Sequence, residues 1–571
     1  MSARPTTNSD QQAVLTSSAV MAAGTTVSRL SGYVRTVLLV LALGSVLHGD
    51  VFTLANTVPN MLYILLAGGI FNAVLVPQLV RSMKYDEDGG EAYANRVVTL
   101  AALFLALVTV VLVAAAPLVM GVFLRPEWDE PALATQRESV VDFARYCLPQ
   151  VFFYGMFVLV GQILNARGRF GPMMWAPIAN NVIAVAVLLV YLGVFGPASS
   201  AEQYAGFTAG QELLLGLGST AGIAVQLLIL LPYLRAAGFT WRPRFDFRDA
   251  GLGHTLRLGF WTVAFVVVNQ IAYTVVVNLA SGGTAQSQLS GGSGPPGSLA
   301  EQGTGYTIYT NSFLIMMVPH AIVTVSLATA VLPRLAARAA DQDLAGLGAS
   351  LAGTLRTALA VVLPFAALVP VISLDLSQAF FGLGAGRDTF PLYQTVLTVF
   401  GPGLVFFTVH YLMLRGFYAL ERTRTVFFVQ CGIAAVNIAA AILLVRATDP
   451  RGTAPALAGA YLAAYAVGSL ASYLVLRRIV GGLDTPTLVR FLVRMAIAVA
   501  AGTGAAWLVS SGLHALVDGP RAFPVAVLTV VAVTATDAAV FLGAARLLRI
   551  REVTDVLQTV LGRGRRRTAA R

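Results

Sequence analysis

Residues 97–123 read VVTLAALFLALVTVVLVAAAPLVMGVF, and no charged side chain interrupts them. A helix needs roughly 20 mostly apolar residues to cross the hydrocarbon core of a bilayer. The stretch therefore predicts a membrane-spanning helix, and the same criterion finds thirteen more. The fourteen predicted spans are 24–44, 54–80, 97–123, 141–163, 173–196, 214–235, 256–280, 306–332, 352–374, 391–414, 425–446, 454–476, 489–511 and 522–547. The predicted fold class is an all-α polytopic membrane protein.

The composition of the chain excludes an ordinary soluble enzyme. Of the 571 residues, 57% are hydrophobic and only 11% are charged, whereas soluble domains carry about 25% charged residues. Cys147 and Cys431 both lie in apolar runs, so neither a disulfide framework nor a metal-ligand cluster is predicted. No glycine-rich phosphate loop follows a strand pattern. We therefore expect a protein that is not an enzyme and that holds no metal or cofactor.

The segments outside the spans divide the chain into two halves of seven spans each. Residues 1–23 are polar and are predicted to be a disordered tail, followed by an N-terminal lobe over 24–280. The Gly-, Ser- and Pro-rich segment 281–305 has the composition of a flexible external loop. A C-terminal lobe with two extra helices is predicted over 306–547, and a basic cytoplasmic tail over 548–571.

The positive charge is distributed by membrane side, which argues against a nucleic-acid partner. With a cytoplasmic N-terminus, 28 of the 38 Lys and Arg residues fall at the inward ends and connections and in the C-terminal tail, and six fall outward. Such a bias is the signature of the positive-inside rule. It predicts that both termini are cytoplasmic.

Short motifs recur at matching positions in the two halves. Val76-Pro77 in the first half matches Leu332-Pro333 in the second, and the turn at Ala166-Arg167 matches the turn at Ala419–Arg422. The separations are 89 residues from Pro77 to Ala166 and 86 residues from Pro333 to Ala419. Two parallel lobes of this kind usually enclose a substrate site near the membrane midplane. Coincidence is the alternative for motifs this short.

Two arginines lie inside the first predicted span, at Arg29 and Arg35. An ionisable side chain within a membrane normally faces a partner or a wet cavity. A six-residue step separates the two by about 120° around a helix, so they can line one broad cavity. The alternative is that both side chains extend to the cytoplasmic interface, and this alternative is weaker for Arg35, which lies two turns deeper.

Asp50 stands at the head of the second span and has two interpretations. It is either the N-cap of that helix or a gate acid that pairs with a cation when the outer mouth closes. Pro59 and Gly68-Gly69 predict that the same helix bends.

The stretch SRLSGYVRTVLLVLALGSVLHGDVFTLANTVPNMLYILLAGGIFNAVLVP at 28–77 resembles the N-terminal signature of the MurJ (MviN) family of lipid II flippases. LNARGRFGPMMWAPIANN at 164–181, PHAIVTVSLATAVLPRLA at 319–336 and LRGFYALERTRT at 414–425 support the resemblance. It covers essentially all of the chain from about residue 24. That family belongs to the transporter superfamily of multidrug antiporters and polysaccharide flippases, which have two lobes around a central cavity.

The resemblance implies transport of lipid II, the undecaprenyl-diphosphate-linked peptidoglycan precursor, from the inner to the outer leaflet of the bacterial cell membrane by alternating access. The family's first-helix arginines fall on Arg29 and Arg35 as cavity residues for the substrate, and its acid falls on Asp50 as a gate. Membrane lipids and cell-wall synthesis proteins are the expected partners of a monomer. The alternatives are a polysaccharide or multidrug exporter of the same superfamily and a non-transporting scaffold for cell-wall synthesis.

The chain departs from the family pattern at several positions. Tyr63 stands where many members carry a further arginine, and residues 306–332 lack the arginine that many members have in the eighth span. Residues 256–280 and 425–446 contain no Asp or Glu, so a sodium site is not carried over. The amides in these spans are expected to form interhelical hydrogen bonds. His320 and His410 are expected to be packed polar residues, and Asp537 has no predicted partner.

Overall fold

The computed structural model describes residues 8–65, 82, 88, 90–246, 252–290, 302–516 and 522–558. Within these ranges the chain is helical and contains no strand. It divides into two compact units, residues 1–281 and 282–571, and the boundary falls within one long helix, α10. Each unit is described by itself.

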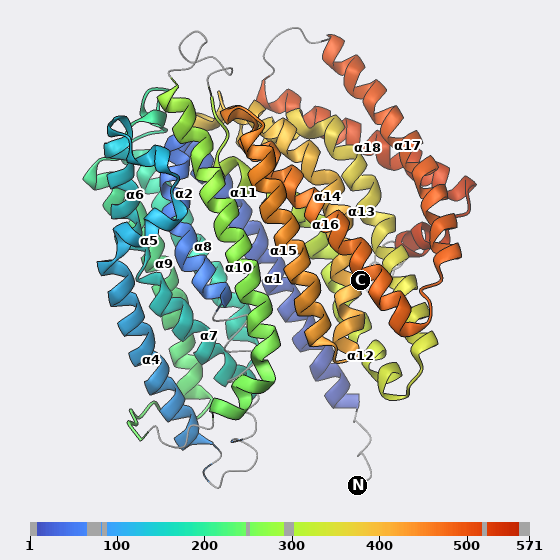
Figure 1. Cartoon of the computed structure of the whole chain (residues 1–571), viewed down its shortest axis with the longest axis horizontal. Coiled ribbons are helices and arrows are strands. Elements are labelled where there is room, and N and C mark those ends of the chain that lie inside the picture. Colours follow the sequence, from blue (N-terminus) through green and yellow to red (C-terminus); the bar gives the residue numbers. More distant parts are fainter. Residues whose placement is uncertain are drawn as a thin grey trace. The chain divides into compact units, whose positions relative to one another are not determined.

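The first unit is a bundle of helices that lie side by side (Figure 1). Its helices are α1 (Asn8–Leu43), α2 (Leu47–Ile64), α4 (Glu91–Ala114), α5 (Ala116–Phe123), α6 (Ala134–Cys147), α7 (Gln150–Ala166), α8 (Gly171–Val194), α9 (Ala209–Ala236) and α10 (Leu252–Leu289). The buried core lies where α4, α7 and α9 meet. Gly155 permits the close approach of α4 and α7, because a Cβ there would lie 2.5 Å from Leu105 Cδ1.

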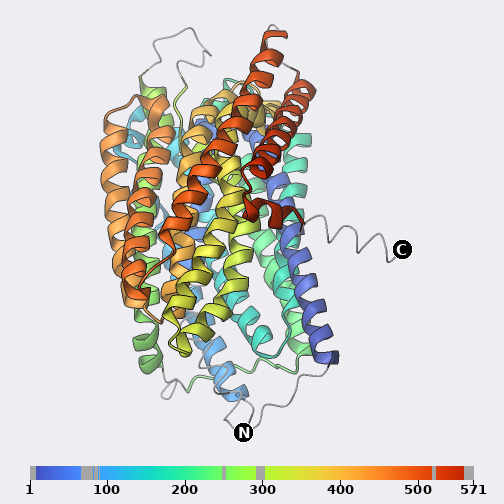
Figure 2. The same cartoon turned by 90° about the vertical axis from the view of Figure 1, so that its right-hand side faces the viewer.

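The second unit is built around α14. Its helices are α11 (Tyr306–Pro319), α12 (Val325–Ala340), α13 (Leu344–Phe381), α14 (Tyr393–Ala419), α15 (Thr423–Arg446), α16 (Thr453–Val480), α17 (Thr485–Leu516) and α18 (Phe523–Leu547). Helix α14 packs against α11, α12, α13 and α16. Helices α17 and α18 lie side by side and both contact α13 (Figures 1 and 2).

Proline explains why several predicted spans are not single straight helices. The fourth span consists of α6 and α7, with Pro149 at the junction. The eighth span passes from α11 through a π-helical turn at His320–Thr324 into α12, directly after Pro319. Proline lacks a backbone N–H and clashes with the preceding turn, so a helix must kink or change its hydrogen-bond spacing there.

The predicted number of spans is confirmed approximately. Twelve helical stretches of the described residues are long and apolar enough to cross a membrane by length and composition. Two further helices, α1 and α2, cover the first two predicted spans as far as Ile64. Residues 66–80 of the second span, including Gly68-Gly69, lie outside the described residues.

Two segments predicted to lack structure are helical in part. Helix α1 begins at Asn8, inside the predicted disordered tail 1–23. Helix α10 continues to Leu289, inside the predicted loop 281–305. Both predictions placed the helix boundary at the edge of the apolar run. A helix that has already formed adds residues at little further cost, and Ala and Gln propagate it well even where they are too polar to span a membrane.

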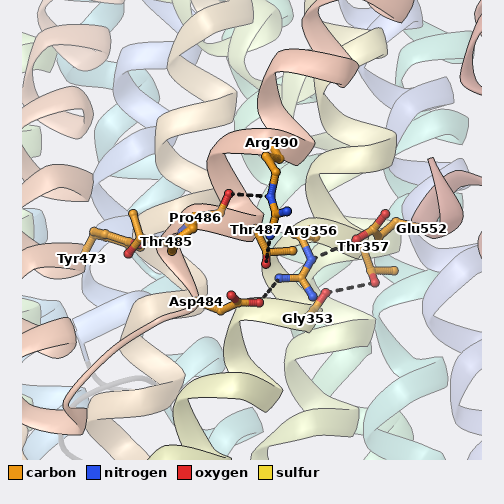
Figure 3. A network of polar contacts seen from close by, with 10 residues as sticks. All are labelled: Gly353, Arg356, Thr357, Tyr473, Asp484, Thr485, Pro486, Thr487, Arg490 and Glu552. Carbon is orange, nitrogen blue, oxygen red and sulfur yellow. Dashed lines mark hydrogen bonds and ion pairs between the residues drawn. The ribbon is translucent and has the colours of Figure 1, made fainter. Parts of the chain in front are cut away.

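The C-terminal segment is attached to the second unit by a polar network (Figure 3). Residues 551–558 form a short helix whose Val553 is buried. Arg356 of α13 donates from Nε to Glu552 Oε1 at 2.9 Å and from Nη1 to Asp484 Oδ2 at 3.2 Å. Asp484 lies in the turn between α16 and α17, so one guanidinium joins three elements.

Candidate functional site

The first helix is held in register by its neighbour α8. Asn181 of α8 donates from Nδ2 to the carbonyl oxygen of Ser28 and to Ser31 Oγ, both at 2.9 Å. Gly24 lies against the Trp175 ring, which a Cβ would approach to 3.2 Å. These contacts fix the rotation of α1 and therefore the directions of its two arginines.

Arg29 is exposed and Arg35 is half-buried. Arg29 interacts electrostatically with Tyr33 one turn further along α1. Arg35 lies within electrostatic range of the Cys147 thiol of α6 and the Tyr154 hydroxyl of α7. In the described part of the first unit, neither arginine forms an ion pair. The deeper arginine is thus close enough to polar groups of two other helices to interact with them electrostatically.

A row of paired polar side chains joins α2 to α7. Gln150 donates from Nε2 to Asn56 Oδ1 at 3.1 Å, and the Tyr154 hydroxyl donates to Asn60 Oδ1 at 3.2 Å. The two members on each helix are four residues apart, which places them on one face. The row ends at Tyr154, whose hydroxyl lies within electrostatic range of Arg35. It was not predicted from the sequence, although amides and a tyrosine at four-residue spacing within apolar spans were a usable signal.

Tyr63 belongs to the same group. Its ring centroid lies 4.7 Å from that of Tyr154. The position that carries an arginine in many relatives is therefore occupied by a phenol beside the Tyr154–Asn60 pair. Together, Arg35, Tyr63, Tyr154 and Asn60 offer one cation with several hydroxyl and amide donors, and such donors bind phosphate oxygens well.

Helix α10 contributes amides that tie the unit together. Gln270 donates from Nε2 to the carbonyl oxygen of Met61 in α2. Asn278 donates from Nδ2 to the carbonyl oxygens of Val122 and Leu124, at 3.2 and 3.1 Å. The predicted role of these two amides in hydrogen bonds between helices is confirmed.

Asp50 lies apart from the arginines. Arg35 is eight residues before the end of α1, a rise of about 12 Å along the helix axis, whereas Asp50 lies in the first turn of α2. Its side chain is fully buried and engaged by the protein. The N-cap of α2 is Val46, so the N-cap interpretation of Asp50 is wrong. The helix starts earlier than the apolar run, because Leu47 and His48 pack inside the unit.

The isolated polar residues of the second unit are packed. His320 Nδ1 lies 3.2 Å from Thr408 Oγ1, and His410 Nδ1 lies 2.8 Å from Ser472 Oγ, with both rings buried. Asp537 is also buried, and its Oδ1 would lie 3.0 Å from a Cβ on Gly502 of α17. The two histidines therefore act in helix packing, as expected.

Comparison with known proteins identifies the family. The family model for the lipid II flippase MurJ matches residues 39–520, which is most of the chain. The chain belongs to the MurJ family. It is 26% identical over 436 residues to a probable lipid II flippase MurJ of Rhizobium meliloti, covering 75% of both chains. It is 25% identical over 428 residues to the lipid II flippase MurJ of Burkholderia cenocepacia, covering 72% of this chain and 75% of that one.

Solved structures agree on the fold. A lipid II flippase MurJ in an inward closed conformation has a TM-score of 0.69 at 16% identity and covers 92% of this chain and 98% of that one. A multidrug resistance MATE family transporter of the MOP superfamily, in an inward-facing conformation, has a TM-score of 0.58 at 15% identity, covering 78% and 94%. The MurJ fold, its curated relatives and the apolar helices together make this chain a multi-pass membrane protein.

Proposed function

We propose that this chain is a lipid II flippase, which moves the undecaprenyl-diphosphate-linked muropeptide from the inner to the outer leaflet of the cytoplasmic membrane. The MurJ family match over residues 39–520 carries this proposal. Flipping moves the lipid without making or breaking a covalent bond. The chain therefore acts as a carrier and not as an enzyme. The undecaprenyl-linked precursor is its substrate.

Arg35 is the principal substrate-binding residue in this proposal, and Arg29 assists it. The substrate carries a diphosphate, and an arginine presents a rigid fork of donors that matches phosphate oxygens. A doubly charged group inside the membrane is costly unless cations and hydrogen bonds replace its hydration. Tyr154, which lies within electrostatic range of Arg35, and its partner Asn60 supply hydrogen-bonding groups that strengthen this replacement.

Asp50 acts as the gate. Asp50 lies in the first turn of α2, about 12 Å of helix rise separates Arg35 from the end of α1, and we therefore assign the carboxylate a role apart from the substrate arginines. Its full burial indicates a position where the protein closes around it. A buried carboxylate is stabilised by a cationic or hydrogen-bonding partner, and the gate opens when that partnership is broken.

The orientation follows from the charge distribution. Both termini face the cytoplasm, and the monomeric carrier presents its site to each leaflet in turn.

The membrane potential drives the cycle, because a dianionic headgroup moving outward across an inside-negative membrane gains about 2.3 kcal/mol per charge per 100 mV. The same field draws the unloaded arginines back toward the cytoplasm.

Replacement of the endogenous flippase in depleted cells tests the proposal. Cells that express this chain should keep growing, and lipid II should become accessible at the outer face of the membrane. If the chain reaches the membrane at a normal level but lipid II stays in the inner leaflet, the proposal is wrong.

A further inference from the structure

We propose that Arg415 of α14, with the aromatic side chains beside it, forms a second diphosphate-binding site in the second unit. The inference rests on the proposed function and adds a loading site to it. In the orientation that the charge distribution predicts, Arg415 lies near the cytoplasmic end of α14, at the level where a lipid-linked diphosphate begins its passage. The eighth span of this chain has no arginine, and Arg415 supplies a cation to the same unit from another helix.

Arg415 lies within a helix, although its span was predicted to end at residue 414. Helix α14 continues to Ala419, so Arg415 is one turn inside it. Its guanidinium carbon stands over the Tyr411 ring, 4.3 Å from the centroid, and 5.9 Å from the Tyr418 ring. An arginine that simply reached for the membrane surface would extend toward the nearer helix end. This one folds back over the preceding turn, toward the middle of the helix.

The charge of Arg415 is not neutralised within the described part of the second unit. No acid there forms an ion pair with it. Its Nε is buried and makes no hydrogen bond in that part of the chain. A buried donor without an acceptor is unfavourable, and a cation in a low-dielectric setting attracts an anion strongly. The arginine is therefore prepared for an anionic ligand that brings its own oxygen acceptors.

The surroundings of Arg415 form a continuous aromatic stripe. Phe407, Tyr411 and Tyr418 lie with Arg415 within about 80° around α14, so all four share one half-buried face. The His320 ring stands edge-on to Tyr411, with centroids 4.8 Å apart. His320 begins the π-helical turn between α11 and α12, and such turns are frequent at functional sites.

Aromatic faces hold the guanidinium in place without consuming its hydrogen-bond donors. A cation over a tyrosine ring is attracted by the electrons of the ring face. The planar fork then keeps its N–H groups available at the edge, where two phosphate oxygens can accept. A carboxylate in place of Tyr411 would occupy those donors and abolish the site.

The test uses the full-length protein in lipid nanodiscs and a polyprenyl diphosphate with a photoreactive group on its terminal phosphate. After illumination, peptide mapping measures labelling of α14 and of α1 separately. The variants are Arg415→Gln, Arg415→Lys and the matched control Arg424→Gln. Arg424 also stands over an aromatic ring, with its guanidinium carbon 5.7 Å from the Phe428 centroid, but it is exposed on α15.

Arg415→Gln should reduce labelling of α14 about tenfold, as expected for loss of a charge-assisted contact, and should leave labelling of α1 unchanged. Arg415→Lys should retain part of the label because the charge remains, and Arg424→Gln should resemble the wild type. Excess undecaprenyl diphosphate should compete, whereas inorganic diphosphate at the same concentration should not. A thermal unfolding midpoint within a few degrees of the wild type shows that each variant is folded.

Equal labelling of α14 in Arg415→Gln and the wild type would overturn the inference. Equal loss in Arg424→Gln would also overturn it, because the effect would then be general electrostatics. Competition by inorganic diphosphate would assign the site to a free anion and not to a lipid headgroup. If the wild type moves lipid II while Arg415→Gln labels normally, only this inference fails; if the wild type moves no lipid II, the proposed function itself fails.

Discussion

At the scale of single residues, Arg35 has the greatest effect on the proposed transport. We expect Arg35→Ala to insert normally and to lower lipid II flipping at least tenfold, because a charge-assisted hydrogen bond contributes about 1.5–3 kcal/mol. Arg35→Lys should retain partial activity, since its point charge survives without the fork. Accessibility of lipid II at the outer face, normalised to protein level, measures both. Arg145→Ala is the control, because Arg145 already pairs with Asp142 at 2.7 Å; normal transport by Arg35→Ala would refute the assignment.

Tyr154 provides a finer test of the same site. Tyr154→Phe removes the hydroxyl that donates to Asn60 Oδ1 but keeps the ring that packs against Tyr63. We expect substrate binding to weaken about three- to tenfold, as one hydrogen bond of about 0.5–1.5 kcal/mol is lost. The thermal unfolding midpoint should change little. Calorimetric titration of the purified protein with lipid II measures the effect, and an unchanged dissociation constant would remove Tyr154 from the site.

At the scale of elements, Arg356 attaches the helix 551–558 to the second unit (Figure 3). Arg356→Ala should release this helix, because the Arg356 side chain is only 16% exposed and its guanidinium joins both Asp484 and Glu552. We expect faster amide hydrogen exchange in residues 551–558 and in the turn at 481–484, with the other helices unchanged. Arg490→Ala is the matched control, since the hydrogen bonds of Arg490 to the described residues stay within its own helix, to Pro486 and Thr487. Unchanged exchange in Arg356→Ala would show that buried Val553, not the ion pair, holds the segment.

The same scale shows what the sequence can predict. The spans were predictable because a helix needs about 20 mostly apolar residues to cross a bilayer, and such runs are visible in the sequence. The π-helical turn after Pro319 was not predictable, because a proline kink has several backbone solutions and packing selects among them. Arg415 was counted with a connection because it follows the apolar run, yet α14 encloses it and places it over Tyr411. Hydropathy marks where a helix leaves the membrane and not where the helix ends.

The candidate site was partly predictable for a related reason. Arg29 and Arg35 are visible in the sequence because ionisable residues inside a span are rare. The Asn56–Gln150 and Asn60–Tyr154 pairs were missed because each partner is ordinary alone, and only the packing of α2 on α7 joins them. The cap interpretation of Asp50, which stood beside the gate interpretation, arises because the apolar run starts after this residue, whereas α2 begins at Leu47.

At the scale of the whole molecule, the energy source is the decisive property. Collapse of the membrane potential with an ionophore should stop flipping even when ATP and lipid II are plentiful. The reason is that two negative charges on the headgroup gain about 2.3 kcal/mol each per 100 mV when they move outward. If flipping continues without a potential but stops when sodium is withdrawn, coupling to an ion gradient replaces this explanation.

Transport of lipid II by the purified protein tests the central claim most directly. Proteoliposomes that contain only this chain and lipid II in the leaflet equivalent to the cytoplasmic one should receive an imposed potential, and the appearance of lipid II in the opposite leaflet should be followed over time. The proposed mechanism predicts transport by the wild type with the potential applied, and at least a tenfold lower rate for Arg35→Ala. Equal rates in liposomes with and without the protein would contradict it.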